Sequence, residues 1–346
     1  MKSLLTTVLT LAVLLGGVSQ VRADSTEVKG GRVTIGGSPY LFNANSCESF
    51  EGKGYPFPAK FESSSLVFDP ADNSFYTTLD KGSPHIVHFR LQDEAIELLR
   101  QDNVVGLTGN FDFEGIEIAG DETGRHLYIA TEKFTSFDTL TCFSVDWETW
   151  EFEPNNIFKL QLEGAGPNNN LEGIAFDPDH RIFYLAKERQ PFALYTYSEK
   201  SGQELVFDET DFVQSLTHFL DSIETDCLTD RRRESLKLTS LSGLDFDQLT
   251  GHLFALNRYG RAVIELEISP FPGNRFNIVA VYPFKGVDFD HFDRKGIAGI
   301  RHYGMAEGLA IYGSGRSRQL ALVTDPGPGN RSHLIIFPFP RPASEF

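Results

Sequence analysis

The sequence predicts an all-β fold, a five-bladed β-propeller with a short helical insertion, and its spacing leaves six blades open as an alternative. Three observations support this prediction: a two-strand motif occurs five times, the spacing within each copy is even, and only one stretch shows helical periodicity. The chain has 346 residues, of which 40% are hydrophobic. This length and composition are typical of a globular protein with a large core and exclude a disordered chain.

Each copy of the motif begins with a small or acidic residue, usually followed by glycine, and continues as an alternating apolar strand. A turn and a second strand rich in aromatic residues complete the copy. The first strands cover 64–70, 114–118, 172–178, 242–247 and 307–311, and the second strands cover 75–80, 127–132, 183–188, 253–258 and 320–325. The separations from the first residue to the last are 16, 18, 16, 16 and 18 residues. Even separations keep the two strands in the same facing register.

The spacing between copies indicates how the sheets are organised. Successive copies begin 50, 58, 70 and 65 residues apart, which leaves room for four strands and their loops. Alternation with a period of two, together with turns rich in Gly, Asp and Pro, predicts antiparallel strands. Sheets repeated radially in this way form a propeller, whereas a β-sandwich would not need the repeat.

One stretch between the third and fourth copies, about 209–236, has a different periodicity. Apolar residues recur there at helical spacing, namely Phe212, Leu216, Phe219, Leu220 and Ile223. This pattern predicts a short amphipathic helix. The segment 230–235 that follows is expected to be a charged, solvated loop, because acidic residues flank its arginine triplet.

The first 23 residues are expected to be a signal peptide. Lys2 supplies a positive charge, residues 4–18 form a short apolar run, and Ala23 ends a small-residue cleavage site. Such a run is short for a bilayer span, so a retained membrane anchor is the lesser alternative. The sequence therefore predicts a secreted or periplasmic protein without an integral membrane span after cleavage. A lead-in at 24–42 and a propeller domain at 43–346 follow the signal peptide.

Charge and cysteine content narrow the range of partners. The net charge of −17 argues against nucleic acid, because binding to phosphates needs clustered Lys and Arg, and it suits a protein that binds cations. Cys47, Cys142 and Cys227 allow at most one disulfide bond within the chain, and their pairing stays open. No cysteine or clustered histidine has the spacing of a zinc site.

Carboxylates recur at two positions of the repeat. The first strand of a propeller blade lines the central channel and runs antiparallel to the second, so the start of one lies beside the end of the other. The starting positions are Ser64, Glu114, Glu172, Ser242 and Glu307, and the ending positions are Asp80, Glu132, Glu188, Arg258 and Asp325. We expect these residues to gather at one mouth of the channel.

Like charges at such a mouth repel one another, by about 4 kcal/mol for a pair about 4 Å apart at an effective dielectric constant of 20. Calcium would relieve the repulsion, since it accepts six to eight oxygen ligands in irregular geometry. The predicted metal ligands are Glu114, Glu172, Glu307, Glu188, Glu132 and Asp325, and the candidate ligand-binding cations are Lys187, Arg189 and Arg258. Two simpler interpretations remain: the polar ends hydrogen-bond neighbouring blades, and the cations pair with the carboxylates.

Six runs follow one another in order from about residue 60 to the C-terminus: Phe113-Glu-Gly-Ile, Leu171-Glu-Gly-Ile-Ala-Phe, Ala186-Lys-Glu-Arg-Gln-Pro-Phe-Ala-Leu-Tyr, Leu241-Ser-Gly-Leu-Asp-Phe, Ala306-Glu-Gly-Leu-Ala and Thr324-Asp-Pro. In these runs the chain resembles the bacterial SdiA-regulated, or YjiK-like, family. The resemblance implies an extracytoplasmic five-bladed propeller with a calcium site. The pattern is more distantly similar to NHL-type, phytase-like and esterase-like propellers.

Two functions remain under consideration. The first is a calcium-binding propeller of the SdiA-regulated type that holds a small-molecule or protein ligand on its acidic face. The second is a calcium-dependent hydrolase of phosphate esters, or of lactones and other esters, with metal-bound water as the nucleophile. A hydrolase of this kind needs an open metal position and cationic side chains for its substrate. Whether the chain is an enzyme stays open.

Overall fold

The computed structural model describes residues 26–29, 32–35, 39–60, 62–80, 82–120, 124–133, 140–160, 162, 171–188, 191–223, 228–238, 240–269, 276–285, 305–313, 317–325 and 331–339. Internal contacts divide the chain into two units, Met1–Gly37 with Gly296–Arg301, and Ser38–Lys295 with His302–Phe346. In the first unit, β1 (Thr26–Lys29) and β2 (Arg32–Ile35) form an antiparallel hairpin. The predicted signal peptide, 1–23, lies outside the described residues.

The second unit contains five antiparallel sheets, each built from consecutive strands. Blade 1 is β6 (Val67–Asp69), β7 (Ser74–Thr78), β8 (His85–Gln92) and β9 (Ala95–Asn103); blade 2 is β10 (Asp112–Gly120), β11 (Arg125–Lys133), β12 (Leu140–Asp146) and β13 (Phe152–Leu160); blade 3 is β14 (Leu171–Asp177), β15 (Ile182–Lys187), β16 (Ala193–Ser198) and β17 (Gly202–Asp208). Blade 4 begins with β18 (Leu241–Asp247), β19 (His252–Asn257), β20 (Ala262–Ile268) and β21 (Phe276–Lys285), and blade 5 with β22 (Met305–Tyr312), β23 (Gln319–Asp325) and β24 (His333–Pro338).

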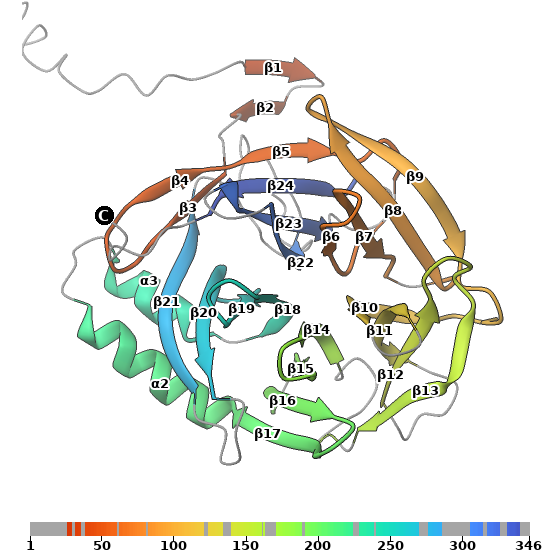
Figure 1. Ribbon diagram of the computed structural model, residues 1–346. Helices are drawn as coiled ribbons and strands as arrows, with labels where there is room; N and C mark the ends of the chain where they lie inside the picture. The colour runs from red at the N-terminus through yellow and green to blue at the C-terminus, as the bar shows by residue number, and fades with distance from the viewer. Residues whose placement is uncertain are drawn as a thin grey trace, which may run out of the picture. The chain divides into compact units, whose positions relative to one another are not determined.

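The five blades surround a central channel (Figure 1). The inner strands β6, β10, β14, β18 and β22 each contact the next, and β22 contacts β6, so the ring is closed. Each inner strand begins at or beside one copy of the sequence motif. The predicted propeller is therefore confirmed, with five blades and not six.

The N-terminal part of the second unit joins the last two blades. Strand β5 (Lys53–Pro56) pairs with β24 as the outermost strand of blade 5. Strands β3 (Tyr40–Phe42) and β4 (Ser49–Glu51) extend blade 4, because β3 pairs with β21. Blade 5 thus combines segments from opposite ends of the chain, which fastens the ring, and β3 comes from the segment expected as a lead-in.

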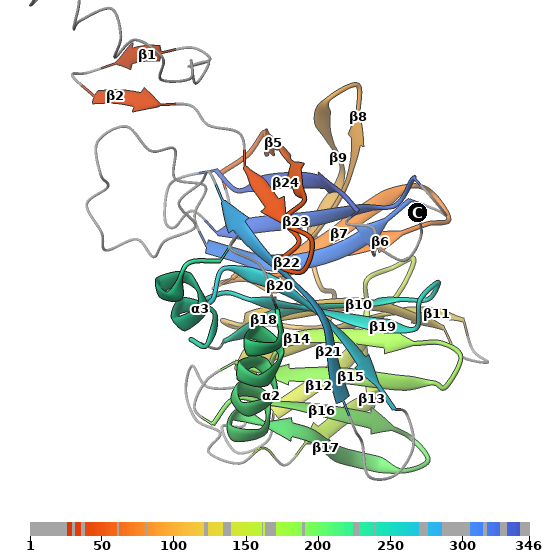
Figure 2. The ribbon, with the colours of Figure 1, turned by 90° about the vertical axis from the view of Figure 1, so that its left-hand side faces the viewer.

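The predicted insertion at 209–236 is helical. Helix α2 (Glu209–Ser222) starts at Asp208, whose side chain accepts a hydrogen bond from the Asp211 amide. It lies against the outer strands β17 and β21 (Figure 2), with Phe212 buried 5.0 Å from the ring of Phe207. The amphipathic pattern in this stretch predicted its buried face correctly.

The expected charged loop at 230–235 is wrong. This segment is a second helix, α3 (Asp230–Leu236), which Thr229 caps. Two of its arginines donate to backbone carbonyls: Arg232 donates to that of Arg261 at 2.7 Å, and Arg233 donates to that of Ile223 at 3.2 Å. These two side chains fasten the insertion to blade 4 and to the end of α2, whereas Arg231 is exposed.

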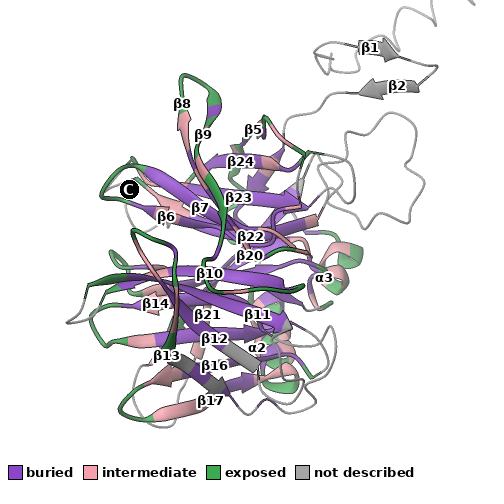
Figure 3. Cartoon of the chain, turned by 90° about the vertical axis from the view of Figure 1, so that its right-hand side faces the viewer, coloured by how far each residue is buried: buried purple, intermediate pink, exposed green. Residues whose placement is uncertain are grey.

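Burial follows the blades from the channel outward. Figure 3 shows that most residues of the inner and middle strands are buried, whereas the free end of the β8–β9 hairpin is exposed.

Cys142 is free and buried, Cys47 takes part in a disulfide bond, and Cys227 lies outside the described residues. In the described part of the chain, no helix has both the length and the apolar character needed to cross a membrane.

The glycines of the last four motif copies lie where neighbouring inner strands approach closely. A Cβ atom on Gly308 would lie 2.5 Å from the backbone carbonyl carbon of Ser65 and 2.6 Å from the amide nitrogen of Leu66. A Cβ atom on Gly243 would lie 3.0 Å from the carbonyl oxygen of Glu307. At both of these positions the nearest atoms belong to the backbone of the next blade.

Substitution of Gly308 by alanine should destabilise the ring, because the backbone of blade 1 would have to move. Overpacking of this kind costs about 1–3 kcal/mol of unfolding free energy. Urea denaturation should show a lower midpoint for Gly308→Ala than for the wild type. The matched control is Gly120→Ala, whose Cβ atom would meet its nearest neighbour, the Gly124 carbonyl oxygen, at 3.5 Å. Equal midpoints for the two variants would contradict the close-approach account.

Candidate functional site

β-Bulges at the start of the inner strands set the direction of the motif residues. The pairing of β10 with β11 shifts between Phe113 and Gly115, which leaves Glu114 out of the ladder. The same irregularity leaves out Glu172 on β14, Ser242 on β18 and Glu307 on β22. A bulge leaves its extra residue unpaired in the ladder and redirects the side chain. All four residues consequently line the axis of the channel.

Seven carboxylates follow one another around this mouth, and we name them the acidic arc. Within each of three groups the carboxylate oxygens lie within 4.8 Å of one another: Glu62, Asp80 and Asp325; Asp80, Asp112 and Glu114; Glu114, Glu132 and Glu172. Asp80 and Glu114 each belong to two groups, so the arc is continuous. It runs from blade 5 through blades 1 and 2 to blade 3.

Glu114 lies at the centre of the acidic arc, with only 8% of its surface exposed. Burial raises the pKa of this carboxyl well above its ordinary value, and the charges of Glu172, Asp80, Asp112 and Glu132 raise it further. Within the described ranges of the chain, no hydrogen bond or ion pair offsets these effects at Glu114. The site therefore favours either a bound cation or a retained proton.

Arg258 occupies the side of the mouth opposite the arc, at the end of β19. Its guanidinium pairs with Glu188 and donates to both oxygens of Glu307, at 2.7 and 2.6 Å. Ser240 also donates to Glu188, at 2.8 Å. Burial alone would lower the pKa of Arg258, but the neighbouring carboxylates, Glu307 foremost, raise it above its ordinary value. Arg258 thus neutralises blades 3 and 5 where the acidic arc ends.

A small cavity lies on the axis between these groups. Its volume is about 10 Å³, which is room for one water molecule or one ion. Glu114, Glu172, Ser242 and Glu307 lie at its polar end. Its other wall consists of one buried apolar residue from each blade, which together we name the plug: Leu66, Ile116, Ile174, Leu244 and Leu309. Each residue of the plug lies two positions after the start of its motif copy.

The structure brings most of the sequence-predicted site residues to one mouth. Glu114, Glu132, Glu172 and Asp325 belong to the acidic arc, while Glu188 and Glu307 pair with Arg258. Their role as metal ligands stays a prediction. Lys187 is fully buried and its ammonium donates to the Pro191 carbonyl at 2.8 Å, and Arg189 lies outside the described residues. Arg258 pairs with carboxylates, as the simpler interpretation of the candidate cations expected.

Two members of the acidic arc, Glu62 and Asp112, escaped the sequence analysis. Both lie two residues before the start of a motif copy. Alternation places such residues on the same side of the strand, so extending the motif by two positions would have found them. The two serines at starting positions bond to neighbouring blades instead, as Ser242 does to the Ala306 carbonyl at 3.2 Å.

Comparison with known proteins agrees with this architecture. The model of the SdiA-regulated family matches residues 57–272, more than half of the chain. The chain belongs to the SdiA-regulated family. The matched segment includes β6 to β20, and with them the acidic arc apart from Asp325. The resemblance found in the sequence runs is thereby confirmed.

Solved structures of similar shape share little sequence with this member of the SdiA-regulated family. A chain of the nidogen–laminin complex is 13% identical, with 88% of this chain and 99% of that chain covered and a TM-score of 0.42. A gluconolactonase of Xanthomonas campestris is 10% identical, with 88% and 95% covered and a TM-score of 0.44.

Replacement of Arg258 by methionine should destabilise the protein strongly, because it removes the buried guanidinium that pairs with both Glu188 and Glu307. Loss of one partner from a buried ion pair costs about 3–5 kcal/mol. The triple variant that also carries Glu188→Gln and Glu307→Gln should recover most of this loss. Urea denaturation followed by circular dichroism measures both. A wild-type midpoint for Arg258→Met alone would show that the pair contributes nothing.

Proposed function

We propose that the protein is an extracytoplasmic propeller that binds one calcium ion at the acidic arc and uses this face to hold a small-molecule or protein ligand. The observation that carries the proposal is the position of Glu114, buried among four carboxylates. A divalent cation removes their mutual repulsion. Calcium suits the site because it tolerates irregular geometry and takes only oxygen ligands.

The group formed by Glu114, Glu132 and Glu172 is the proposed centre of the site, with Asp80 and Asp112 beside it. All of these donors are carboxylates, and no histidine or cysteine belongs to any metal-competent group among the described residues. Such a donor set suits calcium better than zinc or copper. A bound ion would join the inner strands of blades 2 and 3 through their side chains.

We favour binding over hydrolysis because the two candidate cations that the structure describes are already engaged. Arg258 is held by Glu188 and Glu307, and Lys187 donates to a backbone carbonyl. Neither is available in this arrangement to hold an anionic ester. The proposed location outside the cytoplasm is supported by the predicted signal peptide at 1–23 and by the disulfide bond of Cys47, a feature typical of oxidising compartments.

Glu114→Gln and Glu172→Gln should each abolish the effect of calcium on stability. With a chelator present, Glu114→Gln should melt at a higher temperature than the wild type, since it removes a carboxyl that must either repel its neighbours or keep its proton in the folded state. With millimolar calcium it should melt at a lower temperature, because the wild type gains about 2.7 kcal/mol when the ion is at 100 times its Kd. Differential scanning calorimetry under both conditions measures this crossing.

The matched control is Glu97→Gln, which removes an exposed carboxylate that pairs with Arg90 on blade 1. It should keep the calcium response of the wild type. Isothermal titration calorimetry should find one calcium site in the wild type and in the control, and none in Glu114→Gln. Absence of calcium binding by the wild type at millimolar concentration would refute the proposal.

Calcium affinity should fall as the pH falls, because a proton and the ion compete for Glu114. The raised pKa of Glu114 also sets the pH dependence of the metal-free protein. The folded state holds this proton where the unfolded state has lost it, so stability falls as the pH rises above the ordinary carboxyl value of 4.5. Glu114→Gln should flatten that slope, and saturating calcium should oppose it. Melting temperatures between pH 4.5 and 8 test both statements.

A further inference from the structure

A second cavity opens at the end of the channel beyond the plug. Its volume is about 570 Å³, which is within the range of small-molecule sites. All five inner strands contribute to it, through residues three or four positions after the start of each motif. Along each inner strand the plug residue lies between the starting position of the motif and the residues that line this cavity, which we describe as the opposite mouth.

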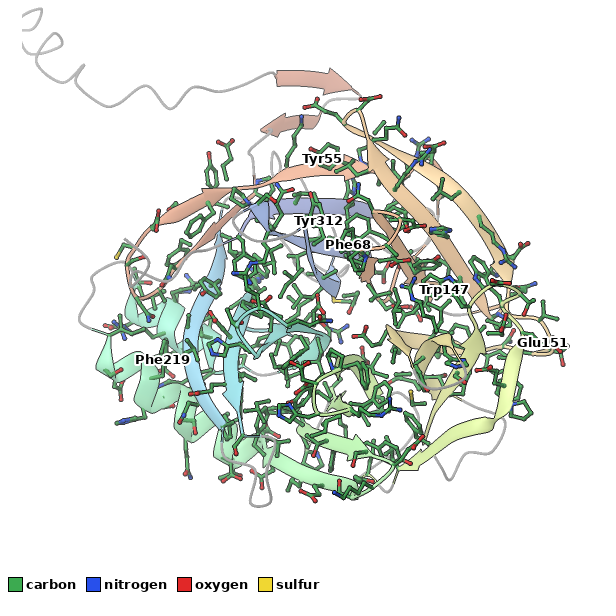
Figure 4. All side chains as sticks on the ribbon, in the orientation of Figure 1. Tyr55, Phe68, Trp147, Glu151, Phe219 and Tyr312 are labelled. Atoms are coloured by element: carbon green, nitrogen blue, oxygen red, sulfur yellow. The ribbon has the colours of Figure 1, made fainter. Side chains whose placement is uncertain are left out.

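A ring of apolar side chains surrounds the opposite mouth, one from each blade. Its members are Phe68, Ile118, Phe176, Phe246 and Ile311, and all are partly exposed to the cavity or solvent. Figure 4 labels Phe68 beside Tyr312, and their ring centroids lie 5.4 Å apart. Phe246 stacks on Tyr184. Phe176 packs on Phe183 with ring centroids 4.6 Å apart, so the ring presents three supported aromatic side chains at one opening.

Two carboxylates lie just inside this ring, Glu117 from blade 2 and Asp245 from blade 4. Glu117 is only 7% exposed. Each carboxylate oxygen accepts one backbone amide: those of Ile118 at 2.6 Å and Phe176 at 3.1 Å for Glu117, and those of Phe246 at 2.8 Å and Ile311 for Asp245. These bonds fix both carboxylates in position and leave further acceptor capacity on every oxygen.

No cationic side chain compensates this pair within the part of the chain that the structure describes. The two guanidinium groups that line the cavity are engaged elsewhere. Arg125 pairs with Asp69 at 2.7 Å and stacks on Trp147, while Arg318 pairs with Asp247 and stacks on Phe339. The opposite mouth therefore combines an apolar ring with two fixed carboxylates that lack a counter-charge.

The proton affinities of the pair agree with this geometry. Burial and the charge of Asp245 raise the pKa of Glu117 well above its ordinary value. Burial, with a contribution from Asp247, raises the pKa of Asp245 to about 7 although two amides oppose the shift. Arg125 and Arg318 line the same cavity, but the carboxylates of Asp69 and Asp247 already pair with them.

We propose that the opposite mouth binds an organic ammonium ion, with its nitrogen between Glu117 and Asp245 and its apolar body against the ring. A protonated amine supplies three donors for the remaining lone pairs of the carboxylates. The faces of Phe68, Phe176 and Phe246 attract a cation through their electron-rich π systems. This site is separate from the acidic arc and does not depend on calcium.

Other occupants fit the opposite mouth less well. A divalent metal ion needs more oxygen ligands than this site offers. Its two carboxylates already accept hydrogen bonds from four amides, and the phenyl rings supply no oxygen ligand. An anion would meet two carboxylates at the base of the cavity, while the arginines at the rim are already paired. A neutral apolar molecule would fill the ring but leave the pair without compensation.

The test uses 2-phenylethylammonium as the probe and 2-phenylethanol as its neutral counterpart. Titration calorimetry on the full chain at pH 8, in the presence of a chelator, should show saturable binding with a Kd near or below about 1 mM. The alcohol should bind at least about tenfold more weakly, since it leaves the charged pair uncompensated. Affinity for the ammonium ion should increase severalfold between pH 5 and pH 8, because Asp245, with a pKa raised to about 7, loses its proton over that range.

Three variants locate the binding. The double variant with Glu117→Gln and Asp245→Asn should weaken ammonium binding at least about tenfold. Phe246→Leu keeps an apolar side chain but removes one aromatic face. It should therefore weaken the binding of the ammonium ion more than the binding of the alcohol. Glu97→Gln, an exposed carboxylate on β9, should leave the affinity unchanged.

Equal affinity for the alcohol and the ammonium ion would overturn the proposal, as would full retention of binding in the double variant. If a separate calcium titration finds a second binding site in the wild type that is absent from the double variant, Glu117 and Asp245 bind a metal ion instead. If the double variant does not fold, Phe246→Leu decides: an unchanged ratio of ammonium to alcohol affinity contradicts the site. Because the ammonium and alcohol titrations contain a chelator, failure of these titrations says nothing against the acidic arc, and failure of calcium binding leaves them intact.

Discussion

The convergence of five inner strands on one axis is the constraint on which the rest of this structure depends. Strands meet there so closely that Gly308 faces the backbone of the next blade, and the residue before each such glycine is forced toward the channel by a bulge. Where that residue is glutamate, its carboxylate lies close to other carboxylates in a buried site. Arg258 neutralises one side of the mouth, and the acidic arc is left on the other side.

The same convergence divides the channel into two sites of different character. One apolar residue per blade forms the plug, which lies along each inner strand between the starting residue of the motif and the residues that line the opposite mouth. At the acidic arc the carboxylates crowd one another, which suits a small, doubly charged ion. At the opposite mouth only Glu117 and Asp245 lie within an apolar ring, which suits a larger, singly charged ion. The two sites therefore suit different cations, because they differ in the density of negative charge and in the polarity of the residues that line them.

Much of the fold and of the acidic arc could be predicted from the sequence, because equivalent positions of the repeat copies occupy equivalent places in the blades. Even spacing within the motif located Glu114, Glu132 and Glu172 at one mouth, as they are. The repeat failed where copies differ: Glu117 and Asp245 occupy a position that is alanine or valine in the other copies, so comparison between copies concealed them. The helix at 230–236 depends on backbone carbonyls of blade 4 that accept from Arg232, a partner that local sequence does not reveal.

The central claim is that the acidic arc holds a cation at Glu114, and its most direct test is a crystal structure of the protein with terbium in place of calcium. An anomalous difference map locates the ion without reference to activity or stability. We predict one strong peak between the carboxylates of Glu114, Glu132 and Glu172, on the acidic side of the plug. A map with no peak at this mouth, from crystals equilibrated with millimolar terbium, would contradict the account.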